Sequence, residues 1–313
     1  MAGVCLVTGG AGFIGSHLVA ALAAGGRRVR VFDDFSTGLR ANLDGVSPAP
    51  EVVEGTLTDP AAVGRAVAGC EVVFHLGAVA SVAQSVDDPV RNHAVNATGT
   101  LHVLDAARRA GVRRVVYAGS ASAYGGASDP AGQDEDTPLS PLSPYAAAKL
   151  AGEFYCRAFA ASYGLETVRL RFFNVFGPRQ RPDSPYSGVI AIFAAALAAG
   201  RTPTLHGDGL QSRDFVAVAD VVQALLRAAD TPGVSGHVYN VGTGASVTLL
   251  DLVAELNRHL GTAAVPLHGP PRVGDVRHSR AKIGRIARDL GYAPAVPFAD
   301  GLRRTLEWSK GRG

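Results

Sequence analysis

The sequence lacks most of the features that mark secreted, metal-binding or nucleic-acid-binding proteins. Only three cysteines occur among 313 residues, Cys5, Cys70 and Cys156, and none of them forms a metal-type pair. We therefore expect no bound metal, and reduced, buried thiols of the kind found in a cytoplasmic protein. The formal net charge is +3 and no run of five Lys or Arg is present, so nucleic-acid binding is disfavoured.

Long apolar runs are missing as well. The most apolar stretch, GVIAIFAAALAAG at 188–200, is too short to cross a bilayer. The N-terminal MAGVCLVTGG lacks the basic segment and long apolar run of a signal peptide. We expect a cytoplasmic protein that does not associate with membranes.

Short valine-rich runs alternate with helical stretches along the first half of the chain. The runs VCLVT, RVRVFD, EVV, EVVFHL and RRVVYAG are typical of buried strands, and helices are expected near 13–24, 59–68 and 90–110. This alternation predicts an α/β fold with a doubly wound, Rossmann-like parallel sheet. After LETVRLRFFN the pattern changes. We assign residues 1–174 to a dinucleotide-binding domain and 175–313 to a smaller α/β domain, with 214–241 expected to return to the main sheet.

A glycine-rich turn follows the first expected strand. In TGGAGFIGSHL, Gly9, Gly12 and Gly15 have the spacing G-x-x-G-x-x-G, which lets a pyrophosphate approach the start of a helix. Asp33 ends the second strand, where a carboxylate accepts hydrogen bonds from an adenosine ribose and repels a 2′-phosphate. The pattern favours NAD over NADP. Asp34 is either a second ribose contact or a solvated turn residue.

Three further residues are expected near the same edge of the sheet. Ser120 ends the fifth strand, and SPYAAAK opens a helix with Tyr145 and Lys149 on one face. When a tyrosine and a lysine occur at this spacing without other signals, the simplest interpretation is a half-buried ring beside a solvated lysine. The alternative is a phenol whose pKa the ammonium lowers, so that it acts as a base.

Several motifs together resemble one known family. The segments TGGAGFIGSHL, SASAYG, YAAAK and RFFNVFGPRQ are similar to the extended short-chain dehydrogenase/reductases. The later LHGDGLQSRDFV and RVGDVRHS resemble its nucleotide-sugar epimerase branch, which includes UDP-glucose and UDP-N-acetylglucosamine 4-epimerases. The resemblance covers nearly the whole chain. It implies that Tyr145 is the base, that Ser120 orients the sugar hydroxyl, and that Lys149 holds the nicotinamide ribose. It also implies a homodimer formed through the helices near 90–110 and 145–163.

The resemblance further implies the residues that contact NAD and the UDP-sugar. The NAD set is Thr8, Gly9, Gly12, Phe13, Ile14, Gly15, Asp33, Asp34, Leu57, Leu76, Asn96, Tyr145, Lys149 and Phe173. Asn96 is alternatively a helix amide bonded to backbone, and Phe173 a core ring. The substrate set is Ser120, Ser122, Tyr145, Asn174, Val189, His206, Arg213, Arg272 and Asp275. Val189, His206 and the arginines have ordinary core or surface roles as alternatives.

The expected reaction is a redox-neutral epimerisation at C4 of a UDP-hexose. Related 4,6-dehydratases carry an acid pair after the position of Ser120, where this chain has Ala121 and Ser122, so dehydration is disfavoured. The absence of glutamate at Ser122 also argues against decarboxylation. In the related epimerases a bulky tyrosine in the region of RHS narrows the sugar pocket, so the resemblance implies that the small Ser279 leaves room for an N-acetyl group. A UDP-glucuronate 4-epimerase using Arg179 or Arg181 is an alternative, and so is a non-catalytic NAD-binding regulator.

Overall fold

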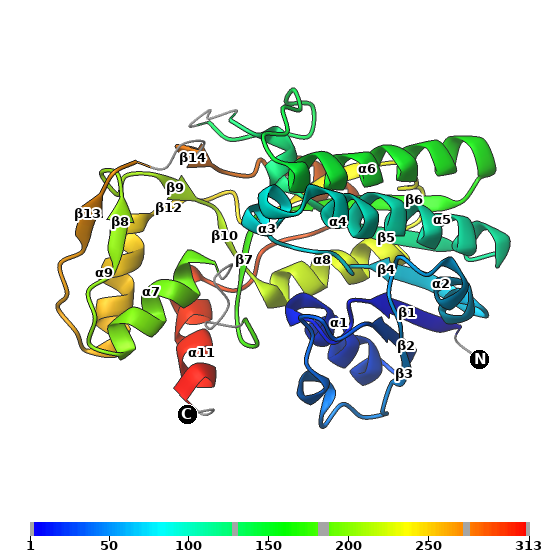
Figure 1. Cartoon of the computed structure of the whole chain (residues 1–313), viewed down its shortest axis with the longest axis horizontal. Helices are drawn as coiled ribbons and strands as arrows, with labels where there is room; N and C mark the ends of the chain where they lie inside the picture. The colour runs from blue at the N-terminus through cyan, green and yellow to red at the C-terminus, as the bar shows by residue number, and fades with distance from the viewer. Residues whose placement is uncertain (1–2, 127–130, 181–187, 272–275, 311–313) are drawn as a thin grey trace.

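One parallel sheet forms the centre of the molecule. The computed structural model describes residues 3–126, 131–180, 188–271 and 276–310 (Figure 1). All neighbouring strands of the sheet are parallel. In spatial order they are β3 (Glu51–Glu54), β2 (Arg28–Asp33), β1 (Val4–Thr8), β4 (Cys70–His75), β5 (Arg114–Ser120), β6 (Glu166–Phe172) and β11 (Val238–Val241).

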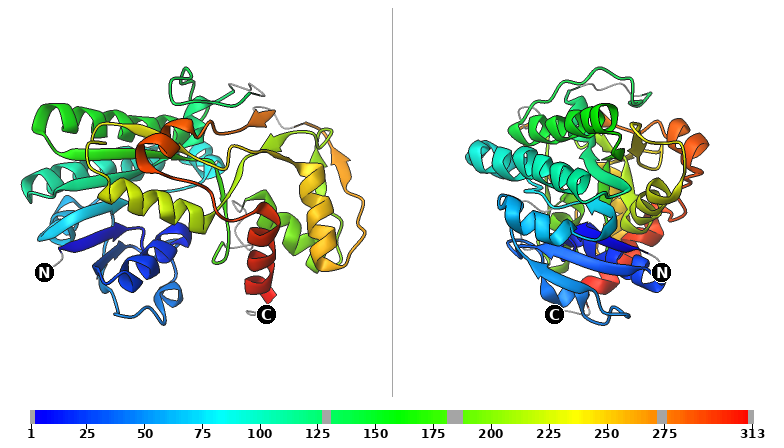
Figure 2. Two further views of the ribbon diagram at one scale, coloured as in Figure 1. Left: turned by 180° about the vertical axis from the view of Figure 1, so that it is seen from behind. Right: turned by 90° about the vertical axis from the view of Figure 1, so that its right-hand side faces the viewer.

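Both faces of this sheet are buried, because successive side chains of each strand enter two different apolar cores. In β1, Cys5 and Val7 belong to one core, and Val4 and Leu6 belong to the other. The first core is covered by α1 (Phe13–Ala24), α8 (Val218–Asp230) and α10 (Gly284–Leu290). The second is covered by α2 (Pro60–Val67), α5 (Gly99–Arg109) and α6 (Pro144–Tyr163). The doubly wound sheet predicted from the sequence is confirmed (Figures 1 and 2).

The helix that carries Tyr145 begins and ends where its sequence dictates. Ser143 caps α6 by accepting a hydrogen bond from the backbone N–H of Ala146, and Pro144 occupies the first helical position. Gly164 ends the helix with a φ of 69°. This cap fixes Tyr145 at the start of the helix, next to the carboxyl ends of the central strands.

The helix expected near 90–110 is continuous but not uniform. It consists of α4 (Pro89–His93), one π-helical turn η2 (Ala94–Thr98) and α5. The short α3 (Val82–Asp87) precedes it, and both α3 and α4 pack against α6. Two 3-10 turns, η1 (Arg40–Leu43) and η3 (Ala121–Tyr124), follow β2 and β5. π-Helical turns are frequent beside functional sites.

The C-terminal part of the chain builds a second, smaller core. The helices are α7 (Val189–Ala198), α9 (Leu249–Leu260) and α11 (Phe298–Lys310). The short strands are β7 (Asn174–Phe176), β8 (Thr204–His206), β9 (Ser212–Arg213), β10 (Phe215–Ala217), β12 (Val247–Thr248), β13 (Leu267–Gly269) and β14 (His278–Ser279). Figure 1 shows this smaller core beside the carboxyl ends of the central strands.

The chain returns from the smaller core to the large sheet. β11 pairs in parallel with β6, and α8 packs on the sheet beside α1. α10 then adds a third helix to the same layer. Division of the chain into two domains at residue 174 stays a prediction. Within the described ranges, no helix is both long and apolar enough to span a membrane.

Candidate active site

The turn between β1 and α1 is built so that its backbone can pack closely. Gly9 has a φ of 69°, and its N–H donates to the Phe32 carbonyl at 2.8 Å. A Cβ on Gly15 would lie 2.1 Å from the Gly9 carbonyl oxygen. Any side chain at Gly15 therefore forces the turn and the helix apart. The turn fits a pyrophosphate at the N-terminus of α1, as the glycine spacing predicts.

A cavity of about 360 Å³ runs from this turn along the carboxyl edge of the sheet. Most of the expected NAD contacts line it: Gly9, Gly12, Phe13, Ile14, Gly15, Asp33, Asp34, Leu57, Leu76, Tyr145 and Lys149. We call this the first cavity. The fold thus brings together residues from the ends of six strands, β1 to β6, and from the start of α6.

Asp33 is positioned by its own backbone contacts. Its carboxylate accepts hydrogen bonds from the N–H groups of Ala11 and Phe35, each at 2.9 Å. Burial raises the pKa of Asp33, and these two donors act in the opposite direction. Asp34 is exposed and accepts hydrogen bonds from the backbone and hydroxyl of Ser36. Asp33 therefore presents a fixed carboxylate to the cavity, whereas Asp34 lies at its open rim.

Thr8 and Asn96 lie behind the cavity wall. The Thr8 hydroxyl is 2.7 Å from His75 Nδ1 and accepts a hydrogen bond from the Gly77 N–H. The Asn96 amide accepts from the Val79 N–H at 2.8 Å and donates to the Val79 carbonyl at 3.0 Å. Gly77 and Val79 line the first cavity. Thr8 and Asn96 thus hold the loop after β4. Asn96 is therefore an amide bonded to the backbone, which was the alternative to a direct contact with NAD.

A second cavity of about 310 Å³ lies between the large sheet and the smaller core. Five of the expected substrate residues line it: Ser120, Ser122, Tyr145, Asn174 and Arg213. Ser279 lines it too, as the pocket-width argument requires. Phe173 belongs to this wall and packs against Tyr124, with ring centroids 6.3 Å apart. Tyr145 is the expected catalytic group that faces both cavities.

Ser120 and Tyr145 meet where the two cavities join. The two side chains lie close enough for Ser120 to lower the pKa of the Tyr145 phenol, against the effect of burial. The Ser120 hydroxyl also accepts from the backbone N–H and the hydroxyl of Ser122, at 3.2 and 2.9 Å. A hydroxyl that accepts two hydrogen bonds has a restricted position, which suits a group that orients a substrate hydroxyl.

Lys149 lies one helical turn beyond Tyr145, against the floor of the first cavity. Its ammonium donates to the Ala118 carbonyl at 3.0 Å and lies 5.1 Å from the centre of the Tyr117 ring. Burial lowers the pKa of Lys149 to about 8, and the carboxylate of Glu153 acts in the opposite direction.

The expected effect of Lys149 on the tyrosine is wrong for the protein alone. Burial raises the pKa of Tyr145, and the effect that opposes it is the hydrogen bond from Ser120. The physical reason is that the Lys149 ammonium turns toward the Ala118 carbonyl, below the phenol. Sequence spacing places the two residues on one helical face, but it does not fix where the ammonium points.

Three of the remaining expected residues lie elsewhere. Val189 starts α7 and packs against the smaller core, and His206 Nδ1 is 3.2 Å from the Pro270 carbonyl. Arg179 lines the first cavity rather than the second. Asn174, by contrast, is exposed at the start of β7 and faces the second cavity. Arg181, Arg272 and Asp275 lie outside the described residues.

Two wall residues of the second cavity were not expected from the sequence. Tyr124 and Gln133 both line it. Tyr124 stands in the SASAYG motif, and the turn η3 that follows Ser120 was a usable signal for it. Gln133 lies in the long connection before α6, which has no helical or strand period from which the direction of a side chain could be predicted.

The sheet, the glycine turn and the Ser120, Tyr145 and Lys149 group define a dinucleotide-binding protein of the short-chain dehydrogenase/reductase type. A model of the "Epimerase: NAD dependent epimerase/dehydratase family" matches residues 5–242. The chain belongs to this family, in its nucleotide-sugar epimerase branch, and its cofactor is NAD.

Similar proteins cover the whole chain. UDP-glucose 4-epimerase of Mycolicibacterium smegmatis is 42% identical over 310 residues, which are 98% of each chain. The crystal structure of UDP-glucose 4-epimerase with UDP-glucose from Thermotoga maritima has a TM-score of 0.94 at 37% identity and covers 99% of each chain. The Thermus thermophilus UDP-glucose 4-epimerase complex with NAD has a TM-score of 0.89 at 37% identity and covers 99% of this chain and 100% of that one.

The family is chemically diverse. UDP-N-acetylglucosamine 4-epimerase from Methanobrevibacter ruminantium has a TM-score of 0.94 at 34% identity, covering 100% of this chain and 99% of that one. A dTDP-glucose 4,6-dehydratase of Streptomyces niveus is 34% identical over 317 residues, 97% of this chain and 91% of the relative. Similarity therefore establishes a nucleotide-sugar enzyme family, and the reaction has to be argued from the site.

Proposed function

We propose that the protein is a UDP-hexose 4-epimerase. It interconverts UDP-glucose with UDP-galactose, and UDP-N-acetylglucosamine with UDP-N-acetylgalactosamine, through a 4-keto sugar. The first cavity supports the NAD part of this proposal, because the Gly15 position has no space for a Cβ and Asp33 presents a fixed carboxylate. When bound, NAD supplies the oxidation at C4 and its reversal, together with the positive charge of its ring.

The protein groups at the junction of the two cavities handle the proton and the sugar. Tyr145 takes the proton of the 4-hydroxyl and returns it to the opposite epimer. Ser120 holds that hydroxyl beside the phenol, and Lys149 provides a fixed positive charge beneath it. Asn174 and Arg213 lie on the second cavity, where an amide and a guanidinium suit the diphosphate. Contacts of Arg272 and Asp275 with the nucleotide stay predictions from the family resemblance.

One observation separates epimerisation from the dehydration carried out by related enzymes. In the described part of the chain, the wall of the second cavity contains no aspartate or glutamate. Dehydration needs an acid that protonates a leaving hydroxyl, and neither Ala121 nor Ser122 can do so. Asp134 and Glu135 follow Gln133 of this wall. Asp134 forms an ion pair with Lys282, and Glu135 is buried and accepts a hydrogen bond from the Asn240 N–H at 2.8 Å. These contacts support a site that moves one proton at one carbon.

A product-resolved assay tests this function. Purified protein should convert UDP-glucose to UDP-galactose with no loss of water, and it should also act on UDP-N-acetylglucosamine because the small Ser279 side chain leaves the pocket wide. Separation of C4 epimers by liquid chromatography and mass spectrometry gives the measurement, with UDP-glucuronate and dTDP-glucose as competing substrates. A 4-keto-6-deoxy product would reject epimerisation. Activity on the plain hexoses alone would reject the wide pocket.

UDP-glucuronate 4-epimerisation is the second candidate, and the structure gives it less support. Arg179, the described arginine expected to meet a uronate carboxylate, lies on the first cavity. A non-catalytic NAD-binding regulator has no need of an ordered Ser120–Tyr145 contact at the cavity junction. Turnover of UDP-glucuronate but not UDP-glucose in the same assay would favour the first of these alternatives.

We also propose that the protein is a homodimer. Apolar side chains are exposed on the helices that the resemblance pairs: Val90 on α4 is 78% exposed, and Phe154 on α6 is 55% exposed. Phe154→Glu places a charge in that face and should give monomers in sedimentation velocity, whereas wild type sediments as a dimer. Leu210→Glu is the matched control and should stay dimeric, because Leu210 is a similarly exposed apolar residue in the C-terminal part of the chain. A dimeric Phe154→Glu protein would place the interface elsewhere.

A further inference from the structure

A buried ion pair lies directly behind Lys149. Glu153 follows Lys149 by one turn of α6 and is 1% exposed, and Arg171 on β6 is 3% exposed. The Arg171 guanidinium grips the carboxylate with two contacts, Nε to Oε1 at 3.0 Å and Nη2 to Oε2 at 2.8 Å. Such a two-point contact fixes both groups in direction as well as distance.

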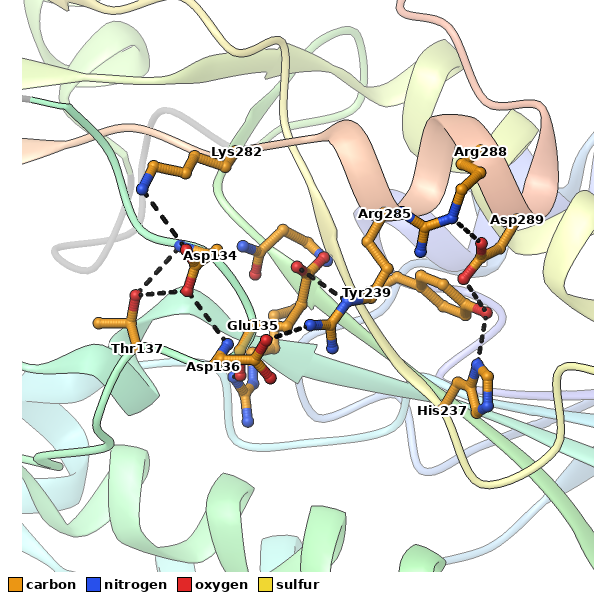
Figure 3. Close-up of polar contacts among 12 residues, drawn as sticks. Asp134, Glu135, Asp136, Thr137, His237, Tyr239, Lys282, Arg285, Arg288 and Asp289 are labelled. Carbon is orange, nitrogen blue, oxygen red and sulfur yellow. Dashed lines mark hydrogen bonds and ion pairs between the residues drawn. The ribbon is translucent and has the colours of Figure 1, made fainter.

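The same guanidinium is anchored to the wall of the second cavity. Its Nη1 donates to the Tyr124 hydroxyl at 3.0 Å, and that hydroxyl donates to the Asn240 amide oxygen at 2.6 Å. The Asn240 N–H in turn donates to Glu135. Figure 3 shows the neighbouring ion pairs: Lys282 contacts Asp134, and Arg285 contacts Glu135 and Asp136. Arg171 is therefore held from several sides, and Glu153 cannot swing away from its place beside Lys149.

Stability alone gives no reason for this arrangement. A buried ion pair contributes little net stability, and apolar side chains of similar volume often serve as well. Its position suggests a different role. Glu153 lies one helical turn from Lys149 on the same buried face of α6, and its negative charge opposes the effect of burial on the ammonium.

We propose that Glu153 is a positioning residue, whose carboxylate, fixed by Arg171, keeps the buried Lys149 ammonium charged at the first cavity. The proposal rests on the role given to Lys149 in the proposed function. Through Arg171, the hydrogen bonds connect Tyr124 on the wall of the second cavity to Glu153, which lies beside the Lys149 ammonium.

Other ionisable groups face Lys149 and Glu153, and their charges also affect the titration of Lys149. They are His75 on β4, Tyr117 on β5, Arg169 and Arg171 on β6, and Tyr145 and Cys156 on α6. Burial keeps the two tyrosines and Cys156 neutral, and it lowers the pKa of His75 to about 3. Near neutral pH the charged groups are therefore the two arginines, both facing Glu153, and the Lys149 ammonium itself.

The lysine content of the chain makes a direct test practical. Lys149, Lys282 and Lys310 are the three lysines of the whole sequence. In protein labelled with lysine carrying ¹³C at the ε position, each ammonium is followed by NMR as pH rises. We expect the signal of Lys149 to titrate about one to two pH units lower in Glu153→Gln than in wild type. Glu153→Asp, which keeps the charge, should restore most of the difference.

A matched control removes a similar pair from the far end of the same strands. Arg114 on β5 contacts Glu166 on β6 at 2.8 Å, so Glu166→Gln should leave the Lys149 titration unchanged. If Glu153→Gln does not fold, the apolar double variant E153L/R171M removes both charges without leaving one unpaired. A smaller downward shift is then expected, because loss of the Arg171 charge offsets part of the effect.

The outcomes separate this proposal from the proposed function. An unchanged Lys149 titration in Glu153→Gln, or in the double variant, would overturn the role of Glu153 whatever the enzyme catalyses. A downward shift supports it even if the product assay shows no epimerisation. In active protein, the alkaline limb of the kcat profile should move down with the NMR midpoint. A fall in activity without movement of that limb would indicate a structural effect and contradict the proposal.

Discussion

Tyr145→Phe should lower kcat for epimerisation about 10³-fold, the scale expected when a proton-transfer group is removed. Tyr145 lies at the junction of the two cavities, beside Ser120. Phenylalanine keeps the ring and loses the hydroxyl, so NAD content and thermal stability should stay close to wild type. Initial rates with UDP-galactose, together with NAD released from denatured protein, give the measurement.

The same helix offers a control for the loss of a phenol. Tyr163→Phe removes the hydroxyl of an exposed tyrosine at the end of α6, and kcat should not change. The tyrosine mechanism also fixes the sign of the pH dependence. Because burial raises the pKa of Tyr145, the rate should fall as pH falls, and this acid limb should be absent from the residual rate of Tyr145→Phe. Near-wild-type turnover in the variant would remove Tyr145 from the reaction.

The fold was predictable where local signals and burial agree. Valine-rich strands buried on both faces predict a parallel sheet, and the structure places alternate residues of β1 in two cores. The helix expected at 13–24 is α1 with those bounds. The strand β8 falls within TPTLHG, where a short strand was expected, but the short α3 and α10 and the other two- and three-residue strands of the smaller core were not expected. Elements this short carry too few residues for a hydrophobic period to be recognised.

Side-chain direction limited the prediction of the site. Glycine positions and strand ends follow from spacing, and the expected cofactor residues Gly9, Gly12, Phe13, Ile14, Gly15 and Asp33 all line the first cavity. Thr8 and Asn96 lie on the expected elements, but their side chains point into the hydrogen bonds that support Gly77 and Val79. Glu153 was not predicted as a site residue, because its position beside Lys149 depends on an ion pair with Arg171, which lies 18 positions away in sequence.

Gly15→Ala should produce protein that is purified without NAD and is less stable by about 1–3 kcal/mol, the usual cost of forcing atoms into a packed site. The new Cβ would lie 2.1 Å from the Gly9 carbonyl oxygen and 2.9 Å from the Gly10 Cα. Both are backbone atoms of the turn, so neither can move aside as a flexible side chain does. Relief of the overlap must shift the turn whose Gly9 and Gly12 line the first cavity.

The same substitution in open space separates a local clash from a general effect of glycine replacement. A Cβ on Gly64 in α2 meets no atom within 4 Å. Gly64→Ala should therefore raise stability by up to about 1 kcal/mol, because alanine favours a helix interior, and should leave NAD content unchanged. Thermal unfolding and chromatography of released NAD measure both variants side by side. Retention of NAD by Gly15→Ala at the wild-type level would mean that close packing of this turn is not what holds the pyrophosphate, and the first cavity would need another explanation.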